Sequence, residues 1–261
     1  MRVLLSLGLT AFVAASATAA VKTKDVSYTF DGVTFKGQLA YDDAVHGKRP
    51  GVLVVHEWWG LNDYAKKRAE ELAKLGYVAF ACDMYGDGKL TTHPEDATKF
   101  ASDVRKNVAV WQGRAKAALK VLAENEMVDS TKLAAMGYCF GGSTALQLAY
   151  SGADLKAVAT FHAALPTPTA DQAKAINAKL LVCHGADDFF IKPEAIKSFK
   201  DGLDAAKVKY TFESYPGAVH SFTVPGADEH KIKGMAYNKE ADEKSWTAMK
   251  SLFAEAFAEK K

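Results

Sequence analysis

Short apolar runs alternate along this chain with longer stretches of helical periodicity. The runs are rich in Val, Leu and Ala, as strands buried on both faces of a sheet usually are. They lie at 51–56, 77–82, 132–136, 155–161, 180–184 and 209–215. The helical patterns cover 62–75, 94–125, 143–150, 193–206 and 238–257. This alternation predicts a mostly parallel sheet with helices on both faces.

Two further runs near the start of the chain predict a hairpin. Val26–Phe30 and Val33–Leu39 flank the dipeptide Asp31-Gly32, which is typical of a tight turn between antiparallel strands. The complete sheet then has about eight strands, and we expect a single α/β domain over residues 21–261.

The first twenty residues differ from the rest. Met1-Arg2 precedes an apolar run, Val3–Val13, and small residues follow as far as Ala20. This order is typical of a secretory signal peptide, and the run is too short to favour a transmembrane helix. The alternative is a buried N-terminal helix. We expect a signal peptide at 1–20, cleavage after Ala19 or Ala20, and export into a bacterial periplasm, with no stable membrane anchor afterwards.

Composition narrows the classes of partner. The chain has 261 residues, is 49% hydrophobic and carries a formal net charge of +2, with basic residues interspersed among acidic ones. Nothing indicates nucleic-acid binding. We expect a monomer or weak homodimer that acts on a small molecule.

Three cysteines leave at least one thiol free. Cys82 and Cys183 end apolar runs, where a cysteine is usually a small buried core residue. No Cys-x-x-Cys or Cys/His spacing suggests a metal site, and we expect no metal or cofactor.

The third cysteine lies in Gly137-Tyr138-Cys139-Phe140-Gly141-Gly142. This is the G-x-S-x-G pattern of a nucleophile elbow, with cysteine in place of serine. Such an elbow presents its nucleophile on a sharp turn between a strand and a helix, and small neighbours let the backbone bend. Cys139 is therefore the candidate nucleophile.

A nucleophile of this kind needs a base and a group that orients the base. His184–Ile191 carries Asp187 and Asp188 after one strand, and Tyr215–Phe222 carries His220 after the last strand. The order nucleophile, acid, histidine is that of α/β-hydrolases. His220 is the candidate base, and Asp188 is favoured over Asp187 as its partner.

A fourth segment, His56-Glu57-Trp58-Trp59-Gly60, follows the strand at 51–56. The backbone N–H groups of Trp58 and Phe140 are candidates for an oxyanion hole. Glu57 would lie near Cys139, where its charge could keep the thiol protonated. The alternative is that Glu57 is an ordinary surface carboxylate in a turn.

The chain resembles the dienelactone hydrolase (carboxymethylenebutenolidase) family over about 26–257. The resemblance rests on five segments: His56–Asn62, Cys82–Tyr85, Gly137–Gly142, His184–Pro193 and His220–Phe222. It implies an α/β-hydrolase fold without a large lid, a triad of Cys139, His220 and Asp188, and a Glu57 that pairs with the resting thiol until substrate arrives.

The chain departs from the family at the residues that hold the substrate carboxylate. The chlorocatechol-pathway enzymes use an arginine four residues after the triad histidine, and here that position is Val224. We also find no convincing arginine between Asp83 and Asp103. These absences argue against dienelactone as substrate, and a small ester, thioester or lactone with an apolar part would suit the candidate pocket residues, which are Trp58, Trp59, Phe140, Phe189 and Phe222.

The sequence thus predicts an exported carboxylic ester hydrolase that works through an acyl-enzyme. Two alternatives remain open: a binding module that has kept the fold without turnover, and an exported redox thiol, which would need a resolving cysteine near Cys139.

Overall fold

A computed structural model describes residues 20–258. The predicted signal peptide, apart from Ala20, lies outside the described residues. The first strand begins at Val21, directly after the predicted leader.

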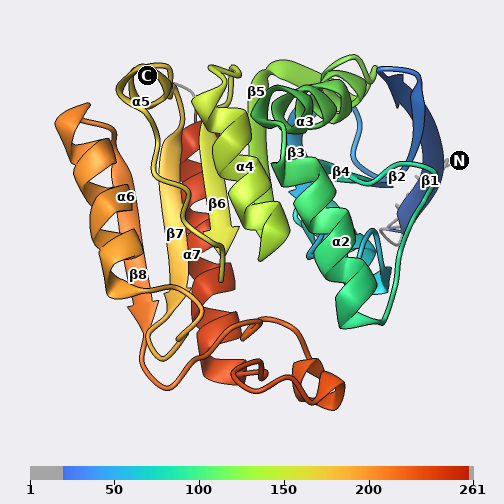
Figure 1. The fold of residues 1–261 in the computed structure, drawn as a ribbon. Helices are drawn as coiled ribbons and strands as arrows, with labels where there is room; N and C mark the ends of the chain where they lie inside the picture. Colours follow the sequence, from blue (N-terminus) through green and yellow to red (C-terminus); the bar gives the residue numbers. More distant parts are fainter. Residues whose placement is uncertain (1–19, 259–261) are drawn as a thin grey trace, which may run out of the picture.

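The described residues build one eight-stranded sheet with the order β1-β2-β4-β3-β5-β6-β7-β8 (Figure 1). β1 and β2, and β2 and β4, pair antiparallel, and every other neighbouring pair is parallel. The expected mostly parallel sheet is therefore confirmed. The strands are β1 (Val21–Phe30), β2 (Val33–Asp42), β3 (Arg49–Val55), β4 (Val78–Cys82), β5 (Val128–Tyr138), β6 (Ala157–Phe161), β7 (Lys179–Gly185) and β8 (Tyr210–Tyr215).

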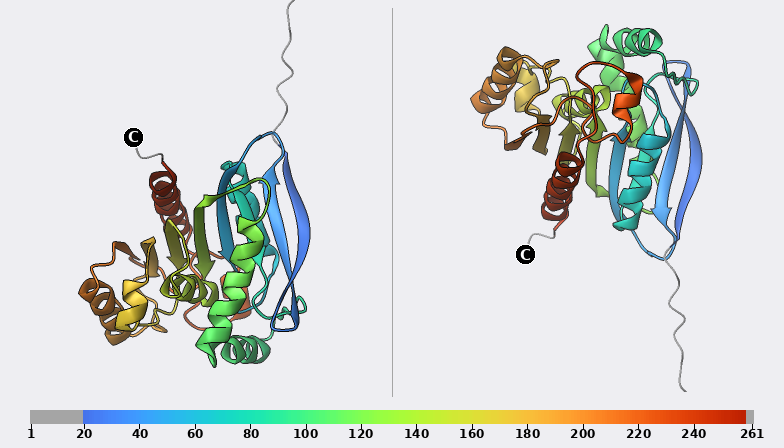
Figure 2. Two further views of the ribbon diagram at one scale, coloured as in Figure 1. Left: turned by 90° about the horizontal axis from the view of Figure 1, so that it is seen from above. Right: turned by 90° about the horizontal axis from the view of Figure 1, so that it is seen from below.

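Helices cover both faces of this sheet, as Figures 1 and 2 show. The helices are α1 (Asp63–Lys74), α2 (Pro94–Arg105), α3 (Val108–Ala123), α4 (Phe140–Tyr150), α5 (Ala170–Lys174), α6 (Pro193–Ala205) and α7 (Lys239–Phe257), with a 3₁₀ turn η1 (Ala227–His230). α1 and α7 pack on one face, while α3, α4 and α6 contribute to the core on the other. The connection between β6 and β7 holds only the short helix α5, so no lid domain is inserted there.

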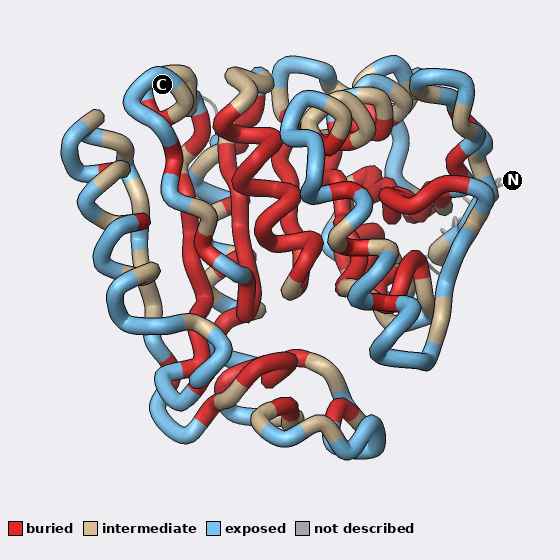
Figure 3. The backbone as a smooth tube through the Cα atoms, in the orientation of Figure 1, coloured by how far each residue is buried: buried red, intermediate tan, exposed pale blue. Residues whose placement is uncertain are grey.

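The helix that follows the elbow lies at the centre of the molecule. Every residue of α4 is buried, and Figure 3 shows it as a continuous buried segment in front of the buried strands. An all-round apolar helix needs cover on every side. Strands β5 and β6 and helix α3 provide that cover.

The N-terminal hairpin follows from its turn residues. Asp31 and Gly32 both have positive φ, 50° and 73°. A two-residue turn of this kind matches the twist of the flanking strands, and it favours Asp-Gly because both positions are left-handed. The strands that it joins are longer than the apolar runs alone indicate.

The long helical region predicted at 94–125 is wrong as one helix. The structure divides it into α2 and α3, because the Asn107 side chain accepts hydrogen bonds from the backbone N–H groups of Ala109 and Val110, at 3.0 and 3.2 Å. A side chain that caps a helix in this way begins a new one. The sequence analysis also missed α5, whose start is fixed by a reciprocal pair of bonds between Thr169 and Gln172.

The carboxyl ends of the parallel strands point to one edge of the sheet, the lower edge in Figure 1. The segment between β8 and α7 crosses this edge. Parallel α/β sheets place their sites at this edge. Among residues 20–258, no helix is long and apolar enough to cross a membrane.

Candidate active site

Cys139 lies on the turn between β5 and α4, with φ 51° and ψ −114°. A non-glycine residue pays for such a backbone conformation, and residues of this kind cluster at functional sites. The backbone N–H of Cys139 donates to the carbonyl of Phe161 at 2.9 Å, which ties the turn to the end of β6. The structure thus presents the thiol as an elbow would.

The glycines of the elbow leave no room for a side chain. A Cβ on Gly137 would lie 2.2 Å from the carbonyl oxygen of Gly141, and a Cβ on Gly141 would lie 2.2 Å from that of Val55. The turn is therefore pressed against the end of β3. This close approach is the physical reason for the small residues around Cys139.

His220 and Asp188 meet beside this turn. His220 Nδ1 donates to Asp188 Oδ2 at 2.7 Å, and Asp188 is only 4% exposed. The backbone N–H of Phe190 donates to Asp188 Oδ1 at 3.0 Å. Asp187 is exposed and points its backbone N–H to the carbonyl of Ala218. Of the two adjacent aspartates, the structure brings Asp188 to the histidine.

The pKa of His220 depends on its burial and on its neighbours Cys139 and Asp188. Burial disfavours the charged ring, but the negative charge of Cys139 and the hydrogen bond to Asp188 outweigh burial and raise the pKa of His220 to about 10. A hydrogen bond between Cys139 and His220 acts in the same direction. These neighbours thus favour the imidazolium form of His220.

The two candidate oxyanion donors follow the ends of two neighbouring strands, β5 and β3. Phe140 is the first residue of α4, and the first N–H groups of a helix have no intrahelical partner. Trp58 follows β3, and Tyr85 Oη donates to its carbonyl at 2.9 Å. His56 also holds this loop, because its Nε2 accepts from the backbone N–H of Met84 at 3.2 Å.

Glu57 is buried, at 2% exposed, and is not a surface carboxylate. Ser221 Oγ donates to its Oε1 at 2.9 Å. Burial raises the pKa of Glu57 to about 7, although the Ser221 bond and the positive charge of His220 oppose this rise. The same Oε1 lies 4.0 Å from Nδ1 of His162, a residue without an assigned role in the sequence analysis.

A hollow of about 260 Å³ opens over Cys139. Its walls are mostly apolar, and they are formed by Trp58, Arg105, Ala164, Phe190, Ile191, His220, Ile232 and Met235. The side chain of Trp58 is thus a wall of the hollow as well as the neighbour of its own amide.

Four residues predicted to line the pocket do not line this hollow. Phe140 is fully buried and stacks on Trp111. Trp59 is 4% exposed and stacks on His230, with ring centroids 4.3 Å apart. Phe222 is fully buried and packs against Tyr215 and His162. Phe189 packs on Gly234, and its neighbour Phe190 takes the place at the hollow. The backbone of these loops turns the predicted aromatics toward the core or the surface.

Arg105 is the functional candidate that the sequence analysis missed. It lies at the end of α2, two residues beyond the segment searched for an arginine, and it lines the hollow of Cys139. Its guanidinium lies over the ring of Phe140, 5.3 Å from the centroid. No carboxylate among residues 20–258 forms an ion pair with it, so its charge is free to meet a ligand.

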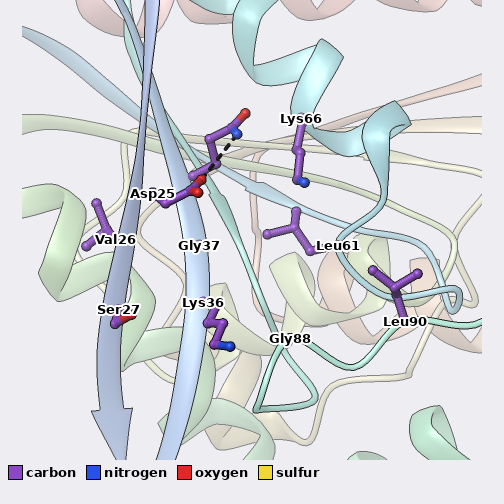
Figure 4. A pocket seen from close by; sticks show the side chains of 10 residues that line it. Asp25, Val26, Ser27, Lys36, Gly37, Leu61, Lys66, Gly88 and Leu90 are labelled. Atoms are coloured by element: carbon purple, nitrogen blue, oxygen red, sulfur yellow. Dashed lines mark hydrogen bonds between the residues drawn. The ribbon is translucent and has the colours of Figure 1, made fainter.

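A second hollow, of about 240 Å³, lies between the N-terminal hairpin and α1 (Figure 4). Lys36 and Lys66 flank it, and Asp25 accepts a hydrogen bond from Gln38 there. Its lining residues include no nucleophile paired with a base. The catalytic candidate is therefore the hollow at Cys139.

A mostly parallel sheet with a cysteine on the turn after its fifth strand, followed in order by an acid and a histidine, is typical of an α/β-hydrolase. The family is also plain from comparison. A sequence model of the dienelactone hydrolase family matches residues 35–257. The chain belongs to the dienelactone hydrolase family.

Individual relatives agree. The protein named usf of Aquifex pyrophilus is 30% identical over 206 residues, covering 76% of this chain and 85% of the relative. A solved structure named m3DLH is 43% identical, with a TM-score of 0.89 and coverage of 92% of this chain and 100% of that one. A dienelactone hydrolase-like promiscuous phosphotriesterase from metagenomic libraries is 42% identical, with the same TM-score and coverage. The chain is accordingly an ester hydrolase of this family.

Proposed function

We propose that this hydrolase cleaves a small ester, lactone or thioester through a covalent intermediate on Cys139. The observation that carries the proposal is the 2.7 Å bond between His220 and Asp188 beside the strained turn of Cys139. Nucleophilic catalysis by a thiol requires a base close to the thiol and an acid that orients the base. His220 and the buried Asp188 would fill these two roles.

The chemistry follows from this arrangement. His220 takes the thiol proton, and the thiolate forms a bond to the carbonyl carbon, whose oxygen becomes negative between the N–H groups of Trp58 and Phe140. The carbon–oxygen bond to the alcohol then breaks, and His220 protonates the leaving oxygen. Water attacks the resulting thioester while His220 accepts its proton, and the acid and the free thiol are released.

The hollow also indicates the kind of substrate. Its apolar walls suit an apolar acyl or alcohol group, and its volume suits a small molecule. Arg105 adds a planar cation, the group that recognises a carboxylate best. We therefore extend the substrate class to small esters and lactones that carry a carboxylate, which the sequence alone argued against.

Hydrolysis of p-nitrophenyl esters by wild type and Cys139→Ala tests the nucleophile. We expect the variant to lose at least ~10³-fold in kcat/KM, and mass spectrometry of quenched wild type to show one acyl group on Cys139. Cys183→Ala is the matched control, because Cys183 is fully buried in β7 and unpaired. Equal rates for wild type and Cys139→Ala would favour the binding module instead.

Arg105→Gln tests the carboxylate handle. We expect KM for a monoester of a dicarboxylic acid to rise about tenfold, since a charged hydrogen bond is lost, while KM for a neutral ester of similar size stays within twofold. An equal effect on both esters would show that Arg105 does not bind the carboxylate.

The redox alternative has less support. Cys82 and Cys183, the other two thiols, are both fully buried, and burial raises the pKa of each well above its usual range. Neither is suited to resolve an oxidised Cys139. Iodoacetamide reactivity measured against pH, with and without His220→Ala, tests it: dependence on His220 supports a catalytic thiolate.

A second activity, phosphotriester hydrolysis, is favoured by one observation, the likeness at 42% identity to a promiscuous phosphotriesterase. Turnover of paraoxon that disappears in Cys139→Ala would support it. Absence of turnover with wild type would exclude it.

We also propose that the protein is exported. The start of β1 at Val21, directly after the predicted cleavage sites, supports this proposal. The mass of the protein recovered from a bacterial periplasm tests it: removal of 19 or 20 residues is expected, and an intact N-terminus would contradict it.

A further inference from the structure

A buried row of polar side chains approaches Glu57 from the face that α1 covers. Arg68 Nε donates to Tyr64 Oη at 3.2 Å, and Tyr64 Oη donates to Thr223 Oγ1 at 2.7 Å. Thr223 Oγ1 lies 2.8 Å from His162 Nε2. The row ends at His162, which is fully buried and whose Nδ1 has no hydrogen-bond partner but lies 4.0 Å from Glu57 Oε1.

The direction of these hydrogen bonds is fixed at the arginine. A guanidinium only donates, so Tyr64 accepts from Arg68 and gives its single proton to Thr223. Tyr64 Oη also lies within 3.1 Å of the Thr223 carbonyl, which accepts from Arg68 Nη2 at 3.0 Å, and we assign the Tyr64 proton to the shorter contact, 2.7 Å to Oγ1. The hydroxyl of Thr223 then accepts from Tyr64 and donates its own proton to His162 Nε2.

This direction determines the tautomer of His162. Burial, together with the nearby positive charge of His220, lowers the pKa of His162 well below its usual value, so the ring is neutral. A neutral ring that accepts at Nε2 carries its proton on Nδ1. The unpartnered atom is therefore an N–H donor, and it faces a carboxyl group.

The carboxyl group is short of donors. Ser221 gives Glu57 a single neutral hydrogen bond, which favours the carboxylate, but a buried carboxylate requires further donors. The titratable groups that face Glu57 from the other elements are His220, Tyr64 and Tyr85, and Cys139 lies beside His220. Among these and His162, the neutral donor left without a partner is His162 Nδ1.

We propose that His162 is a positioning residue for Glu57, whose ionised carboxylate takes up the His162 Nδ1–H as its second hydrogen bond. The move needs about 1 Å, from 4.0 Å to ordinary hydrogen-bond distance. The move draws the negative charge of Glu57 toward His162 and Ser221. On that side His162 is hydrogen-bonded to Thr223, and Thr223 is hydrogen-bonded to Tyr64 of α1. This inference rests on the proposed cysteine mechanism and on the expectation from the sequence that Glu57 lies near Cys139.

The tautomer can be measured on the unmodified protein. A long-range ¹H–¹⁵N spectrum distinguishes protonated from unprotonated ring nitrogens, and Phe replacement of each buried histidine in turn assigns the signals. We expect His162 to carry its proton on Nδ1. A proton on Nε2 would overturn the proposal, whether or not any variant folds.

The coupling to Glu57 can be measured without turnover. A ¹³C titration of labelled glutamate, with Glu57→Gln to assign the signal, should place the Glu57 midpoint near 7 in wild type. His162→Gln carries its amide about as far out as Nε2 and should raise the midpoint by about one pH unit. His162→Asn carries its amide near the position of Nδ1, and its midpoint should differ from that of wild type by no more than about a third of a pH unit.

Equal midpoints in wild type and His162→Gln, with unchanged circular dichroism and melting temperature, would overturn the proposal. Equal shifts in the Gln and Asn variants would also overturn it, because loss of packing alone would then explain both. The ester assay with Cys139→Ala reports separately on the proposed function. A chain inactive on every ester could still show the coupling, and an active one could lack it.

Discussion

Asp188 and Glu57 are two carboxyl groups buried to nearly the same depth, 4% and 2% exposed, beside the same His220–Ser221 segment. Asp188 accepts from the His220 ring and from the backbone N–H of Phe190. Among residues 20–258, Glu57 accepts from the Ser221 hydroxyl alone. Depth of burial therefore does not distinguish the two carboxyl groups, whereas the number and charge of their donors do. Asp188 has two donors and is held against the His220 ring, while Glu57 has one neutral donor and exchanges a proton near neutral pH.

The largest effect should come from removing the charge of Asp188. Asp188→Asn leaves His220 without the anion that orients it and offsets its charge, so kcat/KM should fall by roughly 10³-fold or more. Steady-state hydrolysis of a p-nitrophenyl ester measures this fall. Asp187→Asn is the matched control, because Asp187 is exposed, and it should stay close to wild type. Similar losses in both variants would remove the distinction between the two aspartates.

Glu57→Gln should act on stability and in a pH-dependent way. The folded pKa of about 7 lies above the unfolded value of 4.5, so the folded state binds the proton more tightly. This tighter proton binding stabilises the folded state, and the stabilisation is fully present below pH 4.5. About 3 kcal/mol of stability is lost as the pH rises from 4.5 through 7.

Glutamine keeps the neutral shape and has no charge to bury. The variant should therefore melt several degrees above wild type at pH 8, and the difference should shrink at pH 5. Thermal unfolding at the two pH values measures this. A difference that is independent of pH would show that Glu57 does not titrate near neutrality.

The smallest effect should come from Ser221→Ala, which sharpens the comparison by removing the hydroxyl that donates to Glu57. The Ser221 bond favours the carboxylate, so its removal should raise the Glu57 midpoint above 7 by about half a pH unit. The glutamate ¹³C titration measures the midpoint. An unchanged or lowered midpoint would mean that the Ser221 hydroxyl does not stabilise the carboxylate.

The sequence predicted the parts of the molecule that depend on local patterns. The order of strands and helices, the turn at Asp31-Gly32 and the elbow at Cys139 each follow from a few adjacent residues. The order of Cys139, Asp188 and His220 along the chain indicates a shared edge because parallel strands end together. The structure then supplies the contact between Asp188 and His220 that no single segment contains.

The walls of the site could not be predicted in the same way. Phe189 and Phe190 are adjacent in sequence, and only the path of the loop decides that Phe190 lines the hollow while Phe189 packs on Gly234. Arg105 reaches the hollow because α2 ends there, which the pattern of a single long helix at 94–125 conceals. The tautomer of His162 depends on its hydrogen bond to Thr223, which lies 61 residues away in the sequence.

The contact between the elbow and β3 has a consequence for thermal inactivation. Because Gly141 lies against the backbone of Val55, the turn of Cys139 and the loop of Glu57 and Trp58 form one mechanical unit with the centre of the sheet. Local loosening of the nucleophile would require the central strands to separate. Activity and secondary structure should therefore be lost at the same temperature on heating. In a variant selected for activity at higher temperature, the stabilising substitutions should lie in the sheet and not in the loops around the thiol.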